Sequence, residues 1–270
     1  MNAMTGALQA DLPIYDERRP ELRLRPANAW RHFQNLMKDK ENTEEVFHIF
    51  ESLPWRNLRP SAERFLRSAW GQALRAKEPN LPTLLDDHAA LRRTPAGSLA
   101  HAYCDFMERE GLTAQGLVDE FDKFAQHHEK FEDQFRWYLN RMRDVHDMLH
   151  VLTGYGRDAL GEACVLAFTY SQQPSPAHLF IGYMAGLNIR KQVRSNAPVI
   201  KAVSEGKRLG KACPRLCEQS ITDLLPLPLE DVRRKLNITP AVHYQQAHAR
   251  WAQIGVDPYD LLGKNLKKAA

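Results

Sequence analysis

Two histidines one helical turn apart are the side chains of this sequence best suited to chemistry. His146 and His150 lie in the run HDMLH, and residues four apart on a helix present their side chains on one face. Glu162 follows after eleven residues, in a run whose positions 163–168 are apolar on every side and should be buried. An ionised carboxylate at this position would be energetically unfavourable unless it is paired with a cation or coordinated to a metal. A short reversal between two antiparallel helices would bring Glu162 to His150, and two imidazoles with one carboxylate form a metal site by ligand type.

Asp147 is the fourth candidate, and two roles are open to it. It directly follows His146 and lies about 100° further around the helix. It either completes the ligand set at the edge of the helix or orients a ligand imidazole through a hydrogen bond. The run is similar to the HExxH pattern of zinc peptidases, whose acid is a general base. Because Asp is one methylene shorter than Glu, ligation or support is favoured over that role.

One helix over residues 131–152 should carry both histidines toward the interior. The run Thr153-Gly154-Tyr155-Gly156 should end it with a sharp reversal, and Asp158 should lie near the start of the next helix. The apolar residues of the first helix recur at spacings of four and three and form an inward-facing stripe: Phe131, Phe135, Tyr138, Met142, Val145, Leu149 and Leu152.

The predicted fold is all-α, a single-domain helical bundle with a metal site at a helix-turn-helix junction. No runs rich in Val, Ile and Thr alternate between tight turns, so the evidence for strands is poor. Ser98 should cap a helix that Gly111 closes. The predicted organisation is a flexible N-terminal arm (1–25), one α-helical domain (26–264) and a tail (265–270).

Composition limits the class of protein. The 270 residues include 37 Lys and Arg against 33 Asp and Glu, a net charge of +4, which argues against a dedicated nucleic-acid binder. No apolar stretch reaches the roughly 20 residues that span a bilayer, and the first twenty residues lack the apolar core of a signal peptide. These features predict a cytosolic protein with four reduced, mostly buried thiols: Cys104, Cys164, Cys213 and Cys217.

The candidate ligands resemble the motif of the Coq4 family of ubiquinone (coenzyme Q) biosynthesis proteins, which is HDxxH, eleven residues and Glu. His146, Asp147, His150 and Glu162 fill all four positions. Flanking runs, GSLAHAYCDFMEREGL upstream and VSEGKRLGKACPRLC to DVRRKLNI downstream, are also similar to the family. The resemblance covers about 97–240.

This resemblance implies a divalent metal, commonly zinc, held by His146, Asp147, His150 and Glu162. It implies a lyase-type activity, the oxidative C1 decarboxylation of a polyprenylated hydroxybenzoate, or organisation of the biosynthetic complex, or both. The implied partners are a polyprenyl quinone precursor, other ubiquinone biosynthesis enzymes and a membrane surface, with a second copy of the chain as a further candidate and no nucleic acid. The implied location is cytoplasmic, peripheral to the inner face of the membrane.

A polyprenyl tail needs an apolar groove, for which the run AHLFIGYMAGL (177–187) is the candidate. Phe180 and Met184 within it, with Arg190 and Lys191 just after it, are the candidate lipid-binding residues. An apolar helix bordered by cations suits an anionic membrane surface. A buried core helix with a solvated cationic end fits the same pattern.

Two alternatives to the decarboxylase remain open at this point. In the first, a non-catalytic lipid-binding scaffold, the metal only staples two helices together. In the second, an HD-type phosphohydrolase, His127, His146, Asp147 and Asp223 would supply the metal ligands. The phosphohydrolase hypothesis does not explain Glu162 at its eleven-residue spacing, so it ranks last.

Overall fold

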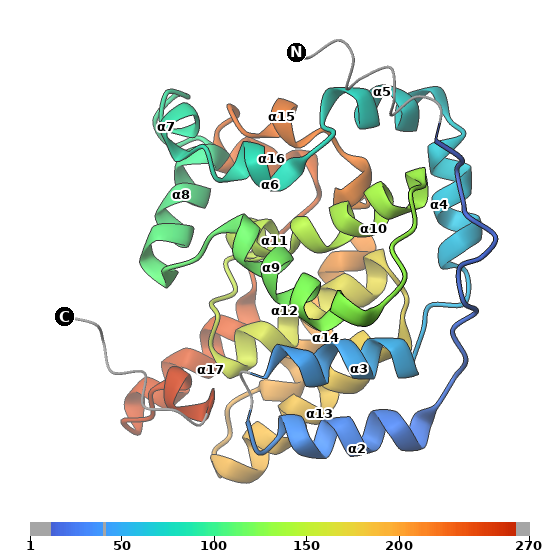
Figure 1. The fold of residues 1–270 in the computed structure, drawn as a ribbon. Helices are drawn as coiled ribbons and strands as arrows, with labels where there is room; N and C mark the ends of the chain where they lie inside the picture. The colour runs from blue at the N-terminus through green and yellow to red at the C-terminus, as the bar shows by residue number, and fades with distance from the viewer. Residues whose placement is uncertain (1–11, 40–41, 263–270) are drawn as a thin grey trace. The chain divides into compact units, whose positions relative to one another are not determined.

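The computed structural model describes residues 12–39 and 42–262, and Figure 1 shows its ribbon. All regular structure in these two ranges is helical, apart from an isolated antiparallel bridge between Ser98 and Pro228. The prediction of an all-α fold is therefore confirmed for the described part of the chain. The chain divides into two compact units, each drawn from three separate stretches of sequence.

Unit 1 comprises residues 12–21, 56–148 and 215–232. Most of its α-helices begin at a side-chain cap, although α4 does not. At Ser98 the hydroxyl accepts a hydrogen bond from the amide of His101, and the same helix ends at Gly111 with a φ of 66°. Both of these ends agree with the sequence prediction. The elements of unit 1 are α4 (Leu58–Leu66), α5 (Ala69–Lys77), α6 (Leu81–Leu85), α7 (His88–Leu91), α8 (Leu99–Glu110), α9 (Ala114–Phe124), η1 (Ala125–His127), α10 (Gln134–Asp144), η2 (Leu216–Glu218) and α15 (Ile221–Leu224).

Unit 2 comprises residues 22–39, 42–55, 149–214 and 233–262. Two helices, α11 (His146–Thr153) and α16 (Leu229–Lys235), run without interruption from one unit into the other. The remaining elements of unit 2 are α2 (Pro26–Leu36), α3 (Thr43–Ser52), α12 (Ala159–Gln172), α13 (Pro176–Gln192), α14 (Val199–Ala212), α17 (Val242–Gln253) and η3 (Pro258–Leu262).

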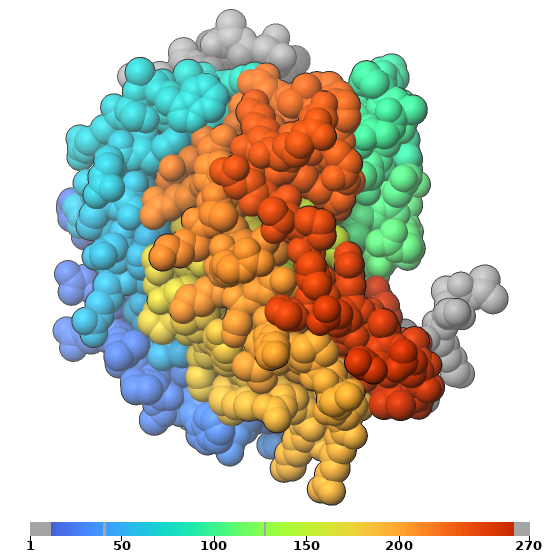
Figure 2. Space-filling model, turned by 180° about the vertical axis from the view of Figure 1, so that it is seen from behind, coloured from blue at the N-terminus to red at the C-terminus, as the bar shows by residue number. Residues whose placement is uncertain are grey.

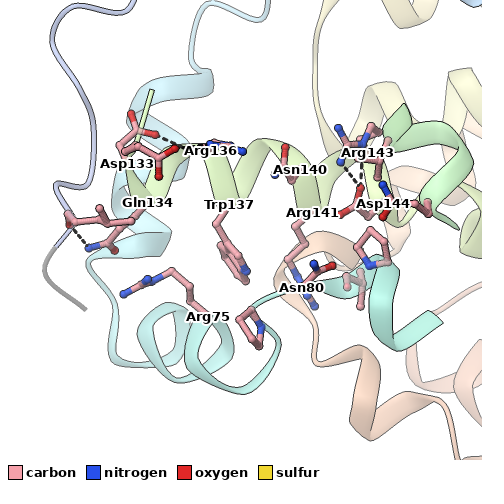
Figure 3. A pocket seen from close by; sticks show the side chains of 17 residues that line it. Arg75, Asn80, Asp133, Gln134, Arg136, Trp137, Asn140, Arg141, Arg143 and Asp144 are labelled. Atoms are coloured by element: carbon pink, nitrogen blue, oxygen red, sulfur yellow. Dashed lines mark hydrogen bonds and ion pairs between the residues drawn. The ribbon is translucent and has the colours of Figure 1, made fainter. Parts of the chain in front are cut away.

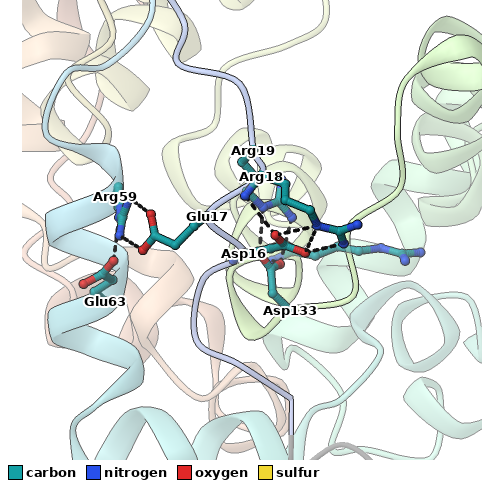
Figure 4. A network of polar contacts seen from close by, with 8 residues as sticks. Asp16, Glu17, Arg18, Arg19, Arg59, Glu63 and Asp133 are labelled. Atoms are coloured by element: carbon teal, nitrogen blue, oxygen red, sulfur yellow. Dashed lines mark hydrogen bonds and ion pairs between the residues drawn. The ribbon is translucent and has the colours of Figure 1, made fainter.

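In unit 1, the segment 12–19 is held against α4 and α10 by ion pairs (Figure 4). The buried carboxylate of Asp133 accepts hydrogen bonds from Arg19 Nε at 2.7 Å and from Arg19 Nη2 at 2.8 Å. Arg59 on α4 pairs with Glu17. Burial alone would raise the pKa of Asp133, but the hydrogen bonds from Arg19 and from backbone amides hold it below its usual range.

Two predicted segments fall wholly or partly outside the described residues. These are the tail 265–270 and the first eleven residues of the arm 1–25. The prediction of one domain over 26–264 stays a prediction. The chain divides into two units, and each unit is compact in itself.

The single helix predicted over 131–152 is in fact two helices, α10 and α11. Val145 lies between them with φ −86° and ψ 2°, whereas an α-helix has ψ near about −42°. The apolar stripe continues through the break, since Tyr138 before it and Leu149 after it are both buried. The spacing of apolar residues therefore carries no sign of the break.

Unit 2 is built around α12, which is buried along most of its length, as predicted. Helix α14 approaches it closely, because a Cβ on Gly206 would lie 2.4 Å from the carbonyl oxygen of Cys164. The side-chain amide of Gln172 donates to the carbonyl oxygens of Gly210 at 2.8 Å and Cys213 at 2.9 Å. Helix α17 packs on α14, and Figure 2 shows the two next to each other, α14 in orange and α17 in red.

A smaller apolar cluster joins α2 and α3, which lie side by side in Figure 1, to α13. Its buried members include Phe33, Ile49 and Ile181. Phe180 and Met184, the candidate lipid-binding residues, pack against this cluster and are partly buried. Much of their apolar surface is thus used inside unit 2.

All four cysteines are free and buried, as expected. Among the helices of the described residues, none is long and apolar enough to cross a membrane.

Candidate metal centre

Helices α11 and α12 bring three of the predicted ligands together. His146, His150 and Glu162 each offer a ligand atom, and these atoms all lie within 4.8 Å of one another. His150 Nε2 lies 3.5 Å from Glu162 Oε2. The predicted approach of Glu162 to His150 is therefore confirmed. The imidazole of His150 is buried and that of His146 is half-buried.

The orientation of the His150 ring is set by the turn that follows it. Its Nδ1 lies 3.1 Å from the carbonyl oxygen of Tyr155. A carbonyl oxygen can only accept, so Nδ1 carries the proton that it donates. In neutral imidazole, Nε2 then presents a lone pair toward Glu162. This is the arrangement of a metal-binding histidine, whose second nitrogen is held by a backbone carbonyl.

The donor set fits a divalent cation. With His150 neutral, two acceptor atoms, His150 Nε2 and Glu162 Oε2, face each other at 3.5 Å, and either a proton on Nε2 or a cation between the two atoms would relieve their repulsion. Ligand atoms bound tetrahedrally to zinc at about 2.0–2.1 Å are roughly 3.3 Å apart. The spacing of these two atoms is thus close to what zinc requires, and His146 adds a second imidazole from one turn earlier on α11.

One side of this cluster is open. The side chain of Glu162 is 30% exposed, and its other oxygen, Oε1, lies 3.7 Å from Nε of Arg157. Arg157 is itself 39% exposed. A guanidinium beside a partly open candidate metal site is a group that can bind an anionic ligand. Arg157 had been given no role from sequence, although it lies in the reversal between the two predicted helices.

Asp147 lies outside the three-residue group. It is half-buried on α11, and its carboxylate is not among the ligand atoms that lie within 4.8 Å of one another. Its charge acts instead on Tyr103 of unit 1: burial, and then the carboxylate of Asp147, raise the pKa of that phenol. Of the four predicted ligands, the structure therefore brings three together.

The turn between α11 and α12 is tightly packed. Gly154 reverses the chain with a φ of 74°. A Cβ on Gly161 would lie 1.9 Å from the carbonyl oxygen of Gly156. Only a glycine at position 161 therefore allows the loop between α11 and α12 to pack against the first turn of α12. Arg233 donates from Nε to the carbonyl oxygen of Leu152 at 2.9 Å, near the end of α11.

A buried polar network anchors the same turn to α17. Asp158 caps α12 by accepting hydrogen bonds from two amides of its first turn. The hydroxyl of Tyr244 donates to Asp158 Oδ2 at 2.5 Å and accepts from the amide of Gly156 at 2.9 Å. His248 Nε2 lies 3.3 Å from Asp158 Oδ1. The network thus fixes the segment that runs from Tyr155, which holds His150, to Glu162.

Comparison with known proteins decides the family. Residues 34–242 match the model of the family described as Coenzyme Q (ubiquinone) biosynthesis protein Coq4. The chain belongs to the Coq4 family. The match includes all four motif residues and begins well ahead of the 97–240 segment that carries the sequence resemblance.

The Coq4 relatives are distant in sequence. The chain is 29% identical over 102 residues to ubiquinone biosynthesis protein COQ4 homolog 2, mitochondrial, of Culex quinquefasciatus, a match covering 38% of this chain and 43% of that protein. A second mosquito homolog is matched over 35% of its length, so the chain spans less than half of either. The human COQ4 homolog, mitochondrial, is 26% identical over 203 residues, with 72% of this chain and 71% of that protein covered.

One solved structure has a similar fold. It is the crystal structure of a candidate ubiquinone biosynthesis protein from Nostoc punctiforme PCC 73102, with a TM-score of 0.53 and 20% sequence identity. The match covers 79% of this chain and 98% of that chain. At this identity the likeness concerns the fold alone.

Helix α17 begins at Val242, where the match to the Coq4 model ends. Sequence reasoning gave Tyr244 and His248 no role, because 86 and 90 residues separate them from Asp158. The only local signal was the helical spacing of apolar residues in α17. Tyr244 and His248 thus come from outside the segment that identifies the family.

Replacing Tyr244 with phenylalanine should cost about 1–3 kcal/mol of unfolding free energy, because the amide of Gly156 and a buried oxygen of Asp158 each lose a partner. The measurement is urea unfolding of the full chain. Tyr183→Phe is the matched control, because its hydroxyl meets Ser204 at an exposed site, and its cost should stay within about 0.5 kcal/mol. Equal effects of the two changes would contradict the role given to Tyr244.

Acid should weaken the Asp158 network. Burial alone would raise the pKa of Asp158, but the hydrogen bond and charge of His248, with the hydrogen bond from Tyr244, hold it below its usual range. A carboxylate whose pKa is lower in the folded protein than in the unfolded chain stabilises the fold fully when the pH is above its unfolded pKa of about 3.9. This stabilisation is lost as the pH falls through the pKa of the folded state. Below about pH 4 the unfolding free energy should fall more steeply in the native chain than in Asp158→Asn, as followed by urea unfolding. Parallel curves for the two proteins would count against this assignment.

The remaining predicted site residues lie elsewhere. Arg190 and Lys191 are exposed in the last turn of α13. Asp223, a proposed ligand of the phosphohydrolase alternative, pairs with Lys77 at 2.6 Å. The side chain of His127, its other distant ligand, lies outside the described part of the chain. Nothing in the described residues supports the phosphohydrolase alternative.

A separate cavity of about 450 Å³ lies in unit 1 against α10 (Figure 3). Three of its arginines pair with carboxylates: Arg143 with Asp144 at 2.8 Å, Arg141 with the buried Glu78 at 2.7 Å, and Arg136 with Glu132 at 2.7 Å. Trp137 lines it and donates to the carbonyl oxygen of Glu78. Because these cations have carboxylate partners, we assign no ligand to this cavity. It includes none of the four motif residues.

Proposed function

We propose that this chain acts in ubiquinone biosynthesis as a metal-dependent enzyme that replaces the C1 carboxyl group of a polyprenylated hydroxybenzoate. The observation that carries this proposal is the pairing of His150 Nε2 with Glu162 Oε2 at 3.5 Å, with the ring held from its other side by Tyr155. Membership of the Coq4 family supplies the pathway.

His146, His150 and Glu162 would hold the cation, which we propose to be zinc, and Asp147 would add negative charge beside it. When bound, this cation would supply a Lewis acid that stabilises the negative charge developing on the ring as CO₂ departs. The partial exposure of Glu162 supports a site that a substrate can reach, since a catalytic site must keep one position open.

Arg157 would bind the carboxylate of the substrate. Its guanidinium is partly exposed beside Glu162, and a planar fork of donors matches a carboxylate in two hydrogen bonds. This contact would orient the aromatic ring over the cluster. In the reaction the bond between the ring and the carboxyl carbon breaks and CO₂ leaves. The ring carbon gains a hydroxyl group in a two-electron oxidation, for which dioxygen is the proposed oxidant. Either water supplies the hydroxyl oxygen and dioxygen leaves as hydrogen peroxide, or dioxygen supplies it and a two-electron donor reduces the second oxygen atom to water.

We propose further that the chain works peripherally at the inner face of the cytoplasmic membrane with other enzymes of the pathway. Arg190 and Lys191 are exposed and suited to anionic head groups. Phe180 and Met184 are only partly buried, so their outer edges remain available to a prenyl tail. A second copy of the chain is a further proposed partner.

The experiment is a turnover assay of the full chain loaded with zinc, using a prenylated hydroxybenzoate labelled with ¹³C in its carboxyl group. Release of labelled CO₂ is expected from the native chain and should be lost in Glu162→Gln. Arg157→Gln should raise KM more than it lowers kcat. His48→Ala, which removes a histidine of α3 whose side chain is 35% exposed, is the control and should turn over normally.

A scaffold is the second candidate function, because the three ligands come from two helices that a cation would tie together. In that case zinc would bind and raise the melting temperature, yet no labelled CO₂ would appear with any prenyl length or oxidant. That result would overturn the enzyme proposal and leave the metal site standing.

A further inference from the structure

A second group of metal-ligand side chains lies in unit 1, between α7 and α8. His88, Cys104 and Glu108 each offer one ligand atom, and these atoms lie within 4.8 Å of one another. None of the three belongs to the motif that identifies the family. The group mixes nitrogen, sulfur and oxygen donors, which distinguishes it from the acidic clusters common on protein surfaces.

The local structure explains how these residues meet. Cys104 and Glu108 are four residues apart on α8, so they lie on one face of that helix. His88 is the first residue of α7, and α7 packs against α8. His88 Nδ1 lies 3.2 Å from Glu108 Oε1. This distance is close to the roughly 3.3 Å that separates two ligand atoms on one zinc ion.

The three side chains differ in exposure in a way that suits a site entered from solvent. Cys104 is fully buried and forms the inner side. His88 is 26% exposed and Glu108 is 54% exposed. A cation held by these three residues would keep a fourth position open to water.

The surrounding charges permit a cation despite a nearby arginine. Arg92 donates to Asp105 at 2.6 Å and to Glu108 Oε2 at 2.8 Å. With His88 neutral, two carboxylates surround one guanidinium, which leaves a net charge of −1. A divalent cation that displaces the thiol proton of Cys104 to solvent would bring the cluster to neutrality. Glu108 can use one oxygen for Arg92 and the other for the metal.

We propose that His88, Cys104 and Glu108 form a second binding site, selective for a cation of the zinc and cobalt class. A thiolate with an imidazole favours such borderline cations over magnesium or calcium, which prefer oxygen ligands. The site does not depend on the proposed function, and binding there would clamp α7 to α8.

Cobalt(II) titration of the full chain separates this site from the motif site. A thiolate bound to cobalt gives a near-ultraviolet charge-transfer absorption, and the group of His146, His150 and Glu162 contains no sulfur. The native chain and His150→Ala should both show this absorption. Cys104→Ala should lose it, while Cys213→Ala, which removes another buried thiol, should keep it.

Two further variants keep the test valid if Cys104→Ala does not fold. His88→Ala and Glu108→Gln change partly exposed side chains, and each should weaken cobalt binding at this site by roughly 10-fold or more, since loss of a group that only orients a ligand already costs that much. Absence of the charge-transfer absorption in the native chain at saturating cobalt would overturn the proposal. Its persistence in a folded Cys104→Ala variant, or unchanged affinity in both His88→Ala and Glu108→Gln, would do the same.

Discussion

Replacing His150 with alanine is expected to lower the affinity of the motif site for zinc by more than about 100-fold. His150 is the buried member of the proposed ligand group, and the Tyr155 carbonyl oxygen fixes its ring. Partners that only orient a ligand are worth about 10–100-fold in affinity, so loss of a ligand should cost more. The measurement is competition with a chromophoric chelator, in a Cys104→Ala background so that only one site contributes.

Three companion variants show whether the effect belongs to the site. Glu162→Gln keeps the shape of the side chain but removes its charge, and should also lose more than about 100-fold in affinity. Asp147→Asn removes a charge that lies outside the three-residue group, so it should lose less affinity than His150→Ala. His178→Ala, a buried histidine that contacts Phe50, should bind zinc like the native chain. An affinity in His150→Ala equal to that of His178→Ala would contradict the ligand role of His150.

Replacing Arg141 with alanine is expected to cost about 3–5 kcal/mol of unfolding free energy. Its guanidinium is fully buried and pairs with the equally buried carboxylate of Glu78 at 2.7 Å. It also donates to the carbonyl oxygens of Cys217 and Gln219, at 2.7 and 2.5 Å. The variant leaves a buried carboxylate without its cation and two carbonyls without donors. Urea unfolding of the full chain measures the loss.

Arg136→Ala is the matched control on the same helix, α10. Arg136 pairs with Glu132 at 2.7 Å, but both side chains are exposed, at 46% and 73%. An exposed pair of this kind contributes about 1 kcal/mol or less. If the two arginine variants lost similar amounts of unfolding free energy, burial would not be what determines the contribution of the Arg141–Glu78 pair to stability. Figure 3 shows both side chains along one helix.

The parts of the candidate metal centre that are local in sequence could be predicted. The spacing of His146 and His150, the glycines of the turn and the acid of the next helix each act within a few residues. They were sufficient to place Glu162 near His150, as the 3.5 Å distance confirms. Ser98 and Gly111 likewise fixed the ends of α8, because caps act through the nearest backbone groups.

The parts that depend on tertiary contact could not be predicted. The break at Val145 changes one ψ angle and leaves the spacing of apolar residues intact, so no periodicity reveals it. Tyr244 acts on Gly156 from 88 residues away, and the carbonyl partners of Arg141 lie 76 and 78 residues away. The packing of the helices determines which polar groups meet across such distances. The sequence around each residue therefore does not predict these contacts.

Crystals of the full chain grown with zinc, with diffraction recorded above and below the zinc absorption edge, would show whether His146, His150 and Glu162 hold one divalent cation. We expect an anomalous peak between His150 Nε2 and Glu162 Oε2, within about 2.2 Å of each and of a nitrogen of His146. Ordered side chains with no peak there at saturating zinc, or zinc found only beside Cys104, would contradict this expectation.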